Sequence, residues 1–150
     1  TMLLNRTQYE KDLERIKPPA VIINMDVDDF KQINDTRGHA AGDYYLRQIA
    51  EVIRTVYGRH GDCYRYGGDE FSLILTKNLH QMEKLNGMFE AALGQLREQD
   101  PQMPMVSLGY ALYEGGIETL YATIEKADAM MYRNKKVNDR AEIVEIAAEF

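Results

Sequence analysis

Apolar and polar residues repeat along this chain with two different periods, which predict strands and helices in turn. A continuous β-branched run opens at Val21, as is typical of a central strand that is covered on both faces. Apolar residues then recur with the helical period over about 42–57 and again over 82–96, whereas 71–75 forms a second strand-like run. The chain therefore alternates strands with amphipathic helices.

The remaining segments extend this pattern. We expect a short helix over 29–35, a strand over 105–113 and a last helix whose apolar stripe covers 117–131. The apolar spacing of 141–146 fits a helix and a strand equally, and we predict a closing edge strand there. With a helix before Val21, these elements predict an α+β fold whose mainly antiparallel central sheet is flanked by helices.

Composition places the chain among ordinary globular proteins. Its 150 residues, 45% hydrophobic and 28% charged, suit one domain with a buried core, and no apolar run is long enough to span a membrane. The lone Cys63 excludes an internal disulfide and is expected to be a buried apolar residue. The net charge of −6 argues against nucleic acid as a partner, because duplex binding requires a basic face. We expect a cytoplasmic domain without direct membrane contact.

The most informative stretch is 65–71, which reads Arg-Tyr-Gly-Gly-Asp-Glu-Phe. Gly67 and Gly68 predict a tight hairpin, because both central residues of such a turn favour positive φ, which glycine adopts without steric cost. Asp69 and Glu70 then place two carboxylates on a rigid, exposed turn, an arrangement that suits a divalent cation. A solvated turn explains this stretch equally well when it is taken alone.

A second acidic group stands at the end of the first predicted strand. Asp26 and Asp28 are two residues apart, so both side chains are expected on one side before the chain turns. A helix-loop-helix calcium site is excluded, because its fifth and sixth positions require an acid and a glycine, whereas this chain has Phe30 and Lys31 there. Two acidic clusters in one chain favour a metal-dependent site over a solvated turn.

Four segments together resemble the GGDEF family of diguanylate cyclases. They are 26–35 (Asp-Val-Asp-Asp-Phe-Lys-Gln-Ile-Asn-Asp), Gly38-His39, Gly42-Asp43 and the hairpin 65–71, and they are joined by a matching strand at 106–110 and a matching helix at 127–135. The resemblance spans nearly the whole chain and implies a palm-like nucleotidyl-cyclase fold with a ferredoxin-like core. We therefore expect 1–150 to be a single GGDEF domain. Its start resembles the tail of the family's opening signature, so we also expect a longer parent protein with a sensory part upstream.

The resemblance implies an enzyme that condenses two GTP molecules into cyclic di-GMP and two pyrophosphates. In this family the 3′-hydroxyl of one GTP attacks the α-phosphate of the other, with Mg²⁺ or Mn²⁺ as the cofactor and two ions at each half-site. Each domain holds one GTP, so two half-sites are expected to face each other across a homodimer. One alternative is a catalytically weak or inactive domain that binds GTP or cyclic di-GMP as a regulatory module. Another is an enzyme that joins GTP with ATP.

The same resemblance assigns roles to individual residues. Asp26, the backbone carbonyl of Val27 and Asp69 would bind metal, with Glu70 at a second metal or as its support. Catalysis would rest on Asp69 as the proton acceptor, on Glu70, and on Lys31 as a charge on phosphate or on the transition state. The remaining substrate-binding positions are Phe30, Asn34, His39, Asp43, Leu46, Gly67, Gly68 and Lys135.

Guanine chemistry agrees with two of these assignments. The N1 and N2 hydrogens of guanine need an acceptor and its O6 needs a donor, and the carboxylate of Asp43 and the carboxamide of Asn34 supply both. Other interpretations stay open elsewhere. Leu46 also suits a hydrophobic core, His39 also suits capping or packing, and a lone lysine on a helix such as Lys135 is usually solvated.

The chain departs from the family pattern in two places. Gly-Arg-Asn commonly follows the phosphate-contacting lysine, whereas this chain has Asp139 where a cation is expected and Arg140 displaced by one position. Many members also carry an inhibitory Arg-x-x-Asp site for the product. Arg59 and Asp62 match those letters but lie one residue too close to the hairpin, and a slip of one residue turns strand side chains to the opposite face. We therefore do not expect product inhibition through them.

Overall fold

One five-stranded sheet organises residues 3–115 and 119–148, which the computed structural model describes. The strands are β1 (Leu4–Asn5), β2 (Ala20–Val27), β3 (Gly61–Arg65), β4 (Glu70–Leu75) and β5 (Val106–Tyr113). Their order is β1-β3-β4-β2-β5; β1 pairs with β3 in parallel, and the other pairings are antiparallel. The helices are α1 (Arg6–Leu13), α2 (Phe30–Arg37), α3 (His39–Tyr57), α4 (Met82–Gln99) and α5 (Leu120–Ala148), with a short 3-10 helix at Leu79–Gln81. The predicted α+β fold is confirmed.

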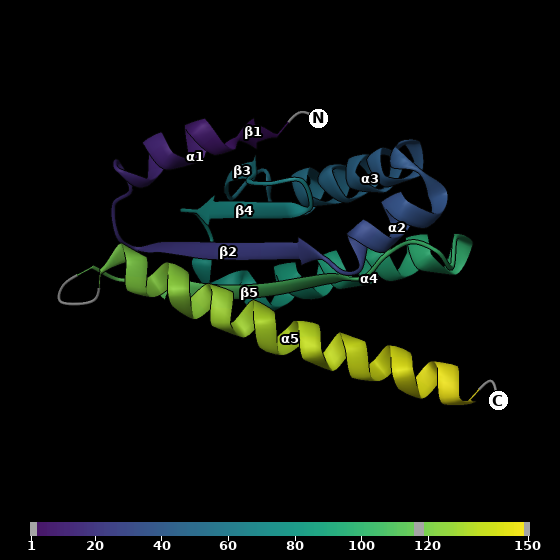
Figure 1. The fold of residues 1–150 in the computed structure, drawn as a ribbon. Coiled ribbons are helices and arrows are strands. Elements are labelled where there is room, and N and C mark those ends of the chain that lie inside the picture. Colours follow the sequence, from purple (N-terminus) through teal and green to yellow (C-terminus); the bar gives the residue numbers. More distant parts are fainter. Residues whose placement is uncertain (1–2, 116–118, 149–150) are drawn as a thin grey trace.

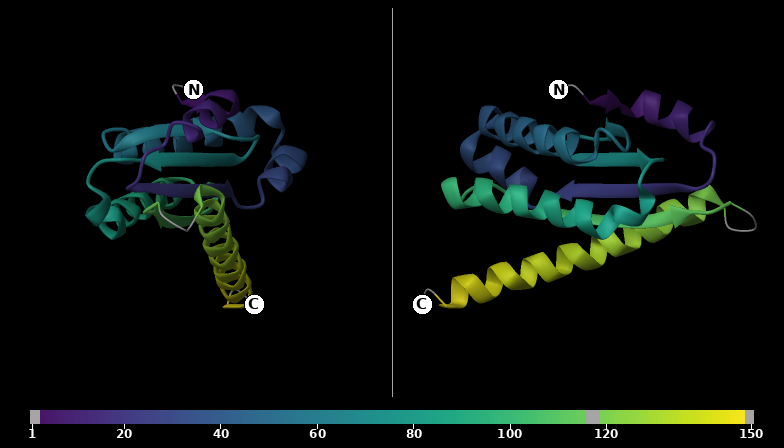
Figure 2. Two further views of the ribbon diagram at one scale, coloured as in Figure 1. Left: turned by 90° about the vertical axis from the view of Figure 1, so that its left-hand side faces the viewer. Right: turned by 180° about the vertical axis from the view of Figure 1, so that it is seen from behind.

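Helices cover both faces of this sheet (Figure 1, Figure 2). α3 and α4 lie over one face, and α1 and α5 lie over the other. Side chains alternate along β2, so Ile23 and Met25 join the core beneath α3 and α4, whereas Ile22 packs with Tyr9 of α1 and Ala127 of α5. The β-branched run that opens at Val21 therefore forms part of a central strand, as predicted. The polar residues at the end of this strand lie at the edge of the cores.

The last helix differs from the prediction. The closing strand expected over 141–146 is wrong, because α5 continues through that segment to Ala148. No glycine or proline interrupts the sequence from Leu120 onwards to that point, and the apolar spacing suits a helix. Figure 1 shows the yellow end of α5 diverging from the sheet. The predicted stripe over 117–131 began at Ile117, which lies outside the described residues.

The helices of the described segments include none that is long and apolar enough to cross a bilayer. Cys63 is buried and unpaired, as expected, and burial raises the pKa of its thiol to about 12. At the junction of α2 and α3, Gly38 adopts a φ of 88°, which ends the first helix two residues beyond its expected end at Asp35. The second then begins at His39, earlier than its expected start near Gly42.

The hairpin between β3 and β4 also differs in detail. Neither Gly67 nor Gly68 has a positive φ, so the expected two-residue turn is wrong. The observed turn is wider, and the amides of Tyr66 and Gly67 both donate to the Glu70 carbonyl, at 2.9 and 3.2 Å. The Arg65 guanidinium donates to the carbonyls of Gly67 and Gly68 at 3.2 and 2.8 Å. These side-chain bonds stabilise a turn that needs no left-handed residue.

Candidate functional site

Acidic side chains from two distant segments meet at one end of the sheet. β2 and β4 pair so that Asp26 lies opposite Glu70, and the Val27 amide donates to the Asp69 carbonyl at 2.9 Å. The strand pairing that the family resemblance implied is therefore observed. Directly opposite residues of an antiparallel pair share a face, so Asp26 and Glu70 lie together on the side that α1 and α5 cover.

Asp26 is largely buried, with 17% of its side chain exposed. Its Oδ2 accepts a hydrogen bond from Lys135 Nζ of α5 at 3.2 Å, whereas its Oδ1 is buried without a partner among the described residues. Burial raises the pKa of Asp26; the Lys135 ammonium opposes that rise, and the neighbouring Asp69 adds to it. A buried carboxylate oxygen without a partner is costly unless a donor or a cation reaches it.

Glu70 and Lys135 share this electrostatic environment. Burial raises the pKa of Glu70, and the charges of Asp26 and Asp69 raise it further. Partial burial alone would lower the pKa of Lys135, but its ion pair with Asp26 and the nearby charge of Asp28 outweigh that effect and raise it. The site is therefore an acidic cluster that holds an ammonium group.

The free energy of unfolding is expected to fall as pH rises through the titration of this cluster. Because the pKa values of Asp26, Asp28 and Glu70 are raised, the folded protein binds extra protons between the ordinary carboxyl pKa and the raised one. Above that window the charged carboxylates destabilise the fold. Asp26→Asn removes one such charge and frees Lys135, which is 37% exposed and regains water. We expect this variant to melt at a higher temperature than wild type near neutral pH without metal.

Thermal unfolding across pH measures this effect. The difference between Asp26→Asn and wild type should shrink as the pH approaches 3.8, the ordinary Asp value. A variant that melts below wild type at neutral pH would contradict the idea that burial dominates the Asp26 environment.

Asp28, two residues beyond Asp26, belongs to a buried hydrogen-bond network and is 3% exposed. Its two oxygens accept from Ser107 Oγ of β5 at 2.8 and 3.0 Å, and Oδ2 also accepts from Asn138 Nδ2 of α5 at 3.0 Å. Asn138 donates in turn to Ser107 Oγ at 3.1 Å. Sequence reasoning placed Asp28 beside Asp26 but missed Ser107 and Asn138, because local patterns carry no signal for contacts that span 79 and 110 residues.

The predicted guanine-reading positions lie where α2 meets α3. Asn34 is partly buried, and its amide oxygen occupies the space that a Cβ on Gly42 would need. Phe30 lies against the same position, with its ring edge 3.1 Å from that Cβ. Asp43 follows directly and is exposed on α3, four residues after its first residue His39. Because Gly42 has no side chain, Asn34 can lie close to α3. The motif included Gly42 but gave no reason for a glycine at this position.

The other predicted positions differ in exposure. Lys31 and His39 are exposed on α2 and at the start of α3. Leu46 is 2% exposed and packs in the large core beneath α3, which is the environment of a core leucine. Arg59 and Asp62 are exposed on either side of the start of β3.

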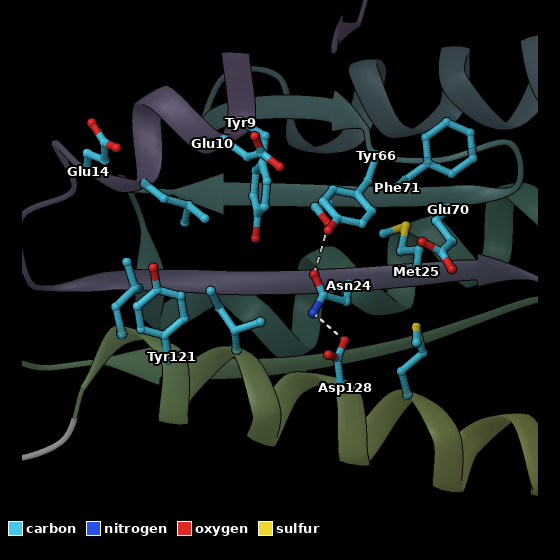
Figure 3. Close-up of a pocket in the computed structure, with 15 residues that line it drawn as sticks. Tyr9, Glu10, Glu14, Asn24, Met25, Tyr66, Glu70, Phe71, Tyr121 and Asp128 are labelled. Carbon is cyan, nitrogen blue, oxygen red and sulfur yellow. Dashed lines mark hydrogen bonds between the residues drawn. The ribbon is translucent and has the colours of Figure 1, made fainter. Parts of the chain in front are cut away.

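A pocket of about 820 Å³ opens beside the acidic cluster, between α1, the β2–β4 pair and α5 (Figure 3). Tyr9 and Tyr66 contribute aromatic side chains to it, and Asn24 Nδ2 donates to Asp128 Oδ1 of α5 at 2.6 Å within it. Of the predicted site residues, Glu70 alone lines this pocket. The positions predicted to hold GTP therefore lie outside this pocket. The pocket is not the predicted nucleotide-binding site.

The acidic cluster suits a hard divalent cation by its donor chemistry. Mg²⁺ binds a few protein carboxylates and completes its octahedral shell with water and phosphate oxygens. Asp26 Oδ1 offers an unused buried oxygen, and Asp69 and Glu70 add carboxylates nearby. Within the part of the chain that the structure describes, no three His, Cys, Asp or Glu side chains form a ready-made metal site. The cluster thus suits a cation that takes its remaining ligands from water and from the phosphate group of a bound ligand.

Comparison with known proteins identifies the family to which this chain belongs. Residues 1–140 match the family described as diguanylate cyclase, GGDEF domain. The chain is 31% identical over 121 residues to diguanylate cyclase A of Treponema denticola and 30% identical over 148 residues to diguanylate cyclase DosC of Escherichia coli. These matches cover 77% and 91% of this chain but 32% of each relative, so the chain spans about a third of their length.

Solved structures agree with the sequence comparison. The active GGEEF domain of a diguanylate cyclase from Vibrio cholerae gives a TM-score of 0.77 at 26% identity, over 90% of this chain and 92% of that one. The GGDEF domain of DgcB from Caulobacter crescentus, solved in complex with c-di-GMP, gives 0.77 at 28% identity, over 91% and 87% of the two chains. The chain therefore belongs to the GGDEF family of diguanylate cyclases and has its palm-like fold.

Proposed function

We propose that this chain makes cyclic di-GMP from two GTP molecules in a Mg²⁺-dependent reaction across a homodimer. The observation that carries the proposal is the convergence of Asp26, Asp69 and Glu70 at one end of β2 and β4, beside the Lys135 ammonium. The relatives named diguanylate cyclases, at 30–31% identity, support the same reaction.

Two roles, metal binding and proton transfer, are assigned to residues of the acidic cluster. Asp26, the Val27 carbonyl and Asp69 would hold one ion, and Glu70 would hold a second or support the first ligands. Bound Mg²⁺ would withdraw charge from the triphosphate and lower the pKa of the attacking 3′-hydroxyl. Asp69 accepts the hydroxyl proton. Lys135 contacts phosphate, and since its ion pair with Asp26 is partly exposed, giving it up costs little.

Nucleotide binding is assigned to α2 and the start of α3. Asn34 and Asp43 read the guanine edge through the carboxamide and carboxylate that its donors and acceptor require. Lys31, three residues before Asn34 on α2, supplies a charge for the phosphates of the same nucleotide.

Gly42→Ala is expected to raise the KM for GTP. Its Cβ would overlap Asn34 Oδ1 and displace that flexible side chain, so the fold persists while one base contact is lost. Such a loss corresponds to about tenfold in KM, with kcat changed by less than about twofold. Steady-state kinetics of cyclic di-GMP formation measures this. Gly94→Ala on α4 is the control, because its Cβ meets nothing within 4 Å. An unchanged KM in Gly42→Ala would contradict the role of Asn34.

Product formation from GTP tests the proposed reaction. Concentrated protein incubated with GTP and Mg²⁺ is expected to release pyrophosphate and cyclic di-GMP in the ratio of two to one that the condensation requires. Specific activity should rise with protein concentration, because two half-sites must meet. Absence of product, even after fusion to a dimeric coiled coil, would reject the enzyme.

One observation favours the alternative of a regulatory module that binds GTP or cyclic di-GMP. Asp139 stands where the family commonly has a cation, and its charge acts on Lys135, one helical turn earlier on α5. An acid there weakens the positive potential offered to phosphate. GTP binding without turnover in the forced dimer would support this alternative.

A further inference from the structure

We propose that Asp28, Ser107 and Asn138 form a positioning set that fixes α5 against the ends of β2 and β5 and so holds Lys135 in place beside Asp26. This role rests on the proposed function, because Lys135 is the α5 lysine that would contact the triphosphate. None of the three residues needs to touch substrate or metal.

Two bridges connect the same stretch of helix to the same end of strand. Lys135 and Asn138 are three residues apart and therefore lie on one face of α5. They reach Asp26 and Asp28, which are two residues apart at the end of β2, at 3.2 and 3.0 Å. Two contacts define both the rotation of the helix and its position along its axis. A shift of α5 that broke the Asn138 bridge would therefore also move Lys135 away from Asp26.

Asp28 and Asp26 differ in whether their carboxylate oxygens already have hydrogen-bond partners. Both oxygens of Asp28 accept hydrogen bonds from neutral donors of the protein, in a site where Asp28 and Ser107 are 3% and 1% exposed. Asp26 keeps a buried oxygen without a partner and an ion pair with a lysine that is 37% exposed. A satisfied, buried network is rigid, whereas an unsatisfied carboxylate is ready for a cation. Asp28 therefore suits positioning and Asp26 suits metal binding.

Asn138 makes two of the hydrogen bonds that attach α5 to the sheet. Its amide donates to Asp28 beyond the end of β2 and to Ser107 of β5. Asn134, one turn earlier, donates to the Leu108 carbonyl of β5 at 2.6 Å, so the helix is attached to β5 at both turns. In this chain α5 also continues past this point to Ala148 without a break. Asn138 thus attaches α5 to both β2 and β5 at a point beyond which the helix continues.

The test compares Asn138→Ala with Asn86→Ala. Asn86 is a buried asparagine whose amide oxygen accepts from Tyr57 Oη at 2.7 Å, and it lies in the core of the opposite face. We expect Asn138→Ala to weaken the affinity for a non-hydrolysable GTP analogue with Mg²⁺ about tenfold, the factor for one hydrogen bond to a charged group. Asn86→Ala should lose stability and leave affinity unchanged. Amide hydrogen exchange over 133–139 should quicken in Asn138→Ala alone.

Asp28 variants separate positioning from metal binding. Asp28→Asn keeps an acceptor for Ser107 and Asn138 and should stay within about threefold of wild-type affinity, whereas Asp28→Ala should lose about tenfold. Equal losses in Asn138→Ala and Asn86→Ala, or a loss in Asp28→Asn as large as that in Asp28→Ala, would overturn the positioning role. Wild-type protein that binds the analogue but yields no cyclic di-GMP would reject the enzyme, while the affinities would still decide the role of these residues.

Discussion

Replacing Asp69 with alanine is expected to abolish cyclic di-GMP synthesis, with kcat lowered by at least about 1,000-fold, since loss of a general base alone costs about 100- to 10,000-fold. Asp69 is assigned two tasks, binding metal and accepting the proton of the 3′-hydroxyl, so both are lost together. The side chain lies in the turn before β4, outside the two hydrophobic cores. The melting temperature should therefore change little.

Product formation at saturating GTP, measured beside thermal unfolding, checks this expectation. Glu83→Ala is the matched control, because it removes an exposed acid from the first turn of α4, over the opposite face of the sheet. The control should retain activity. A folded Asp69→Ala protein that works within about tenfold of wild type would show that the hairpin carboxylate is not the proton acceptor.

Replacing Asp43 with alanine is expected to lower kcat/KM for GTP about 100-fold and to remove the preference for guanine, because two hydrogen bonds to one carboxylate are lost. ITP provides the sharpest comparison, since hypoxanthine lacks the exocyclic amine that the carboxylate would accept from. Wild type should favour GTP over ITP by about tenfold or more. In Asp43→Ala the two nucleotides should react alike.

Competition between GTP and ITP, with products separated by chromatography, measures this ratio. Asp43 is exposed on α3, so its loss should not unfold the chain. An unchanged preference for GTP over ITP in Asp43→Ala would show that other residues recognise guanine. It would contradict the joint role assigned to Asp43 and Asn34.

The fold followed from the sequence where local patterning suffices. The continuous β-branched run from Val21 to Ile23 requires cover on both faces, and β2 is indeed central in the sheet. Local patterning was ambiguous over 141–146, where helix and strand periods both fit. Absence of a breaking residue decided for the helix there.

The hairpin shows why local chemistry can mislead. Glycine permits positive φ, but it does not impose it. At this turn Arg65 donates to the carbonyls of Gly67 and Gly68, and those bonds stabilise a conformation with negative φ instead. A side chain that bonds to a turn is difficult to predict from residue preferences alone.

Motif spacing identified the acids of the candidate site but not their partners. Asp26 and Glu70 stand opposite each other because β2 and β4 pair, which only the family resemblance implied. The contacts of Lys135 with Asp26 and of Asn138 with Asp28 depend on how α5 crosses the sheet. Such contacts join residues more than one hundred positions apart, and no local pattern specifies them.

A crystal grown with Mn²⁺ and a non-hydrolysable GTP analogue tests the central claim most directly. Anomalous scattering should locate a cation about 2.1 Å from oxygens of Asp26 and Asp69, in contact with the triphosphate. Lys135 should then contact phosphate. A triphosphate bound elsewhere, with no cation between those two carboxylates, would contradict the account.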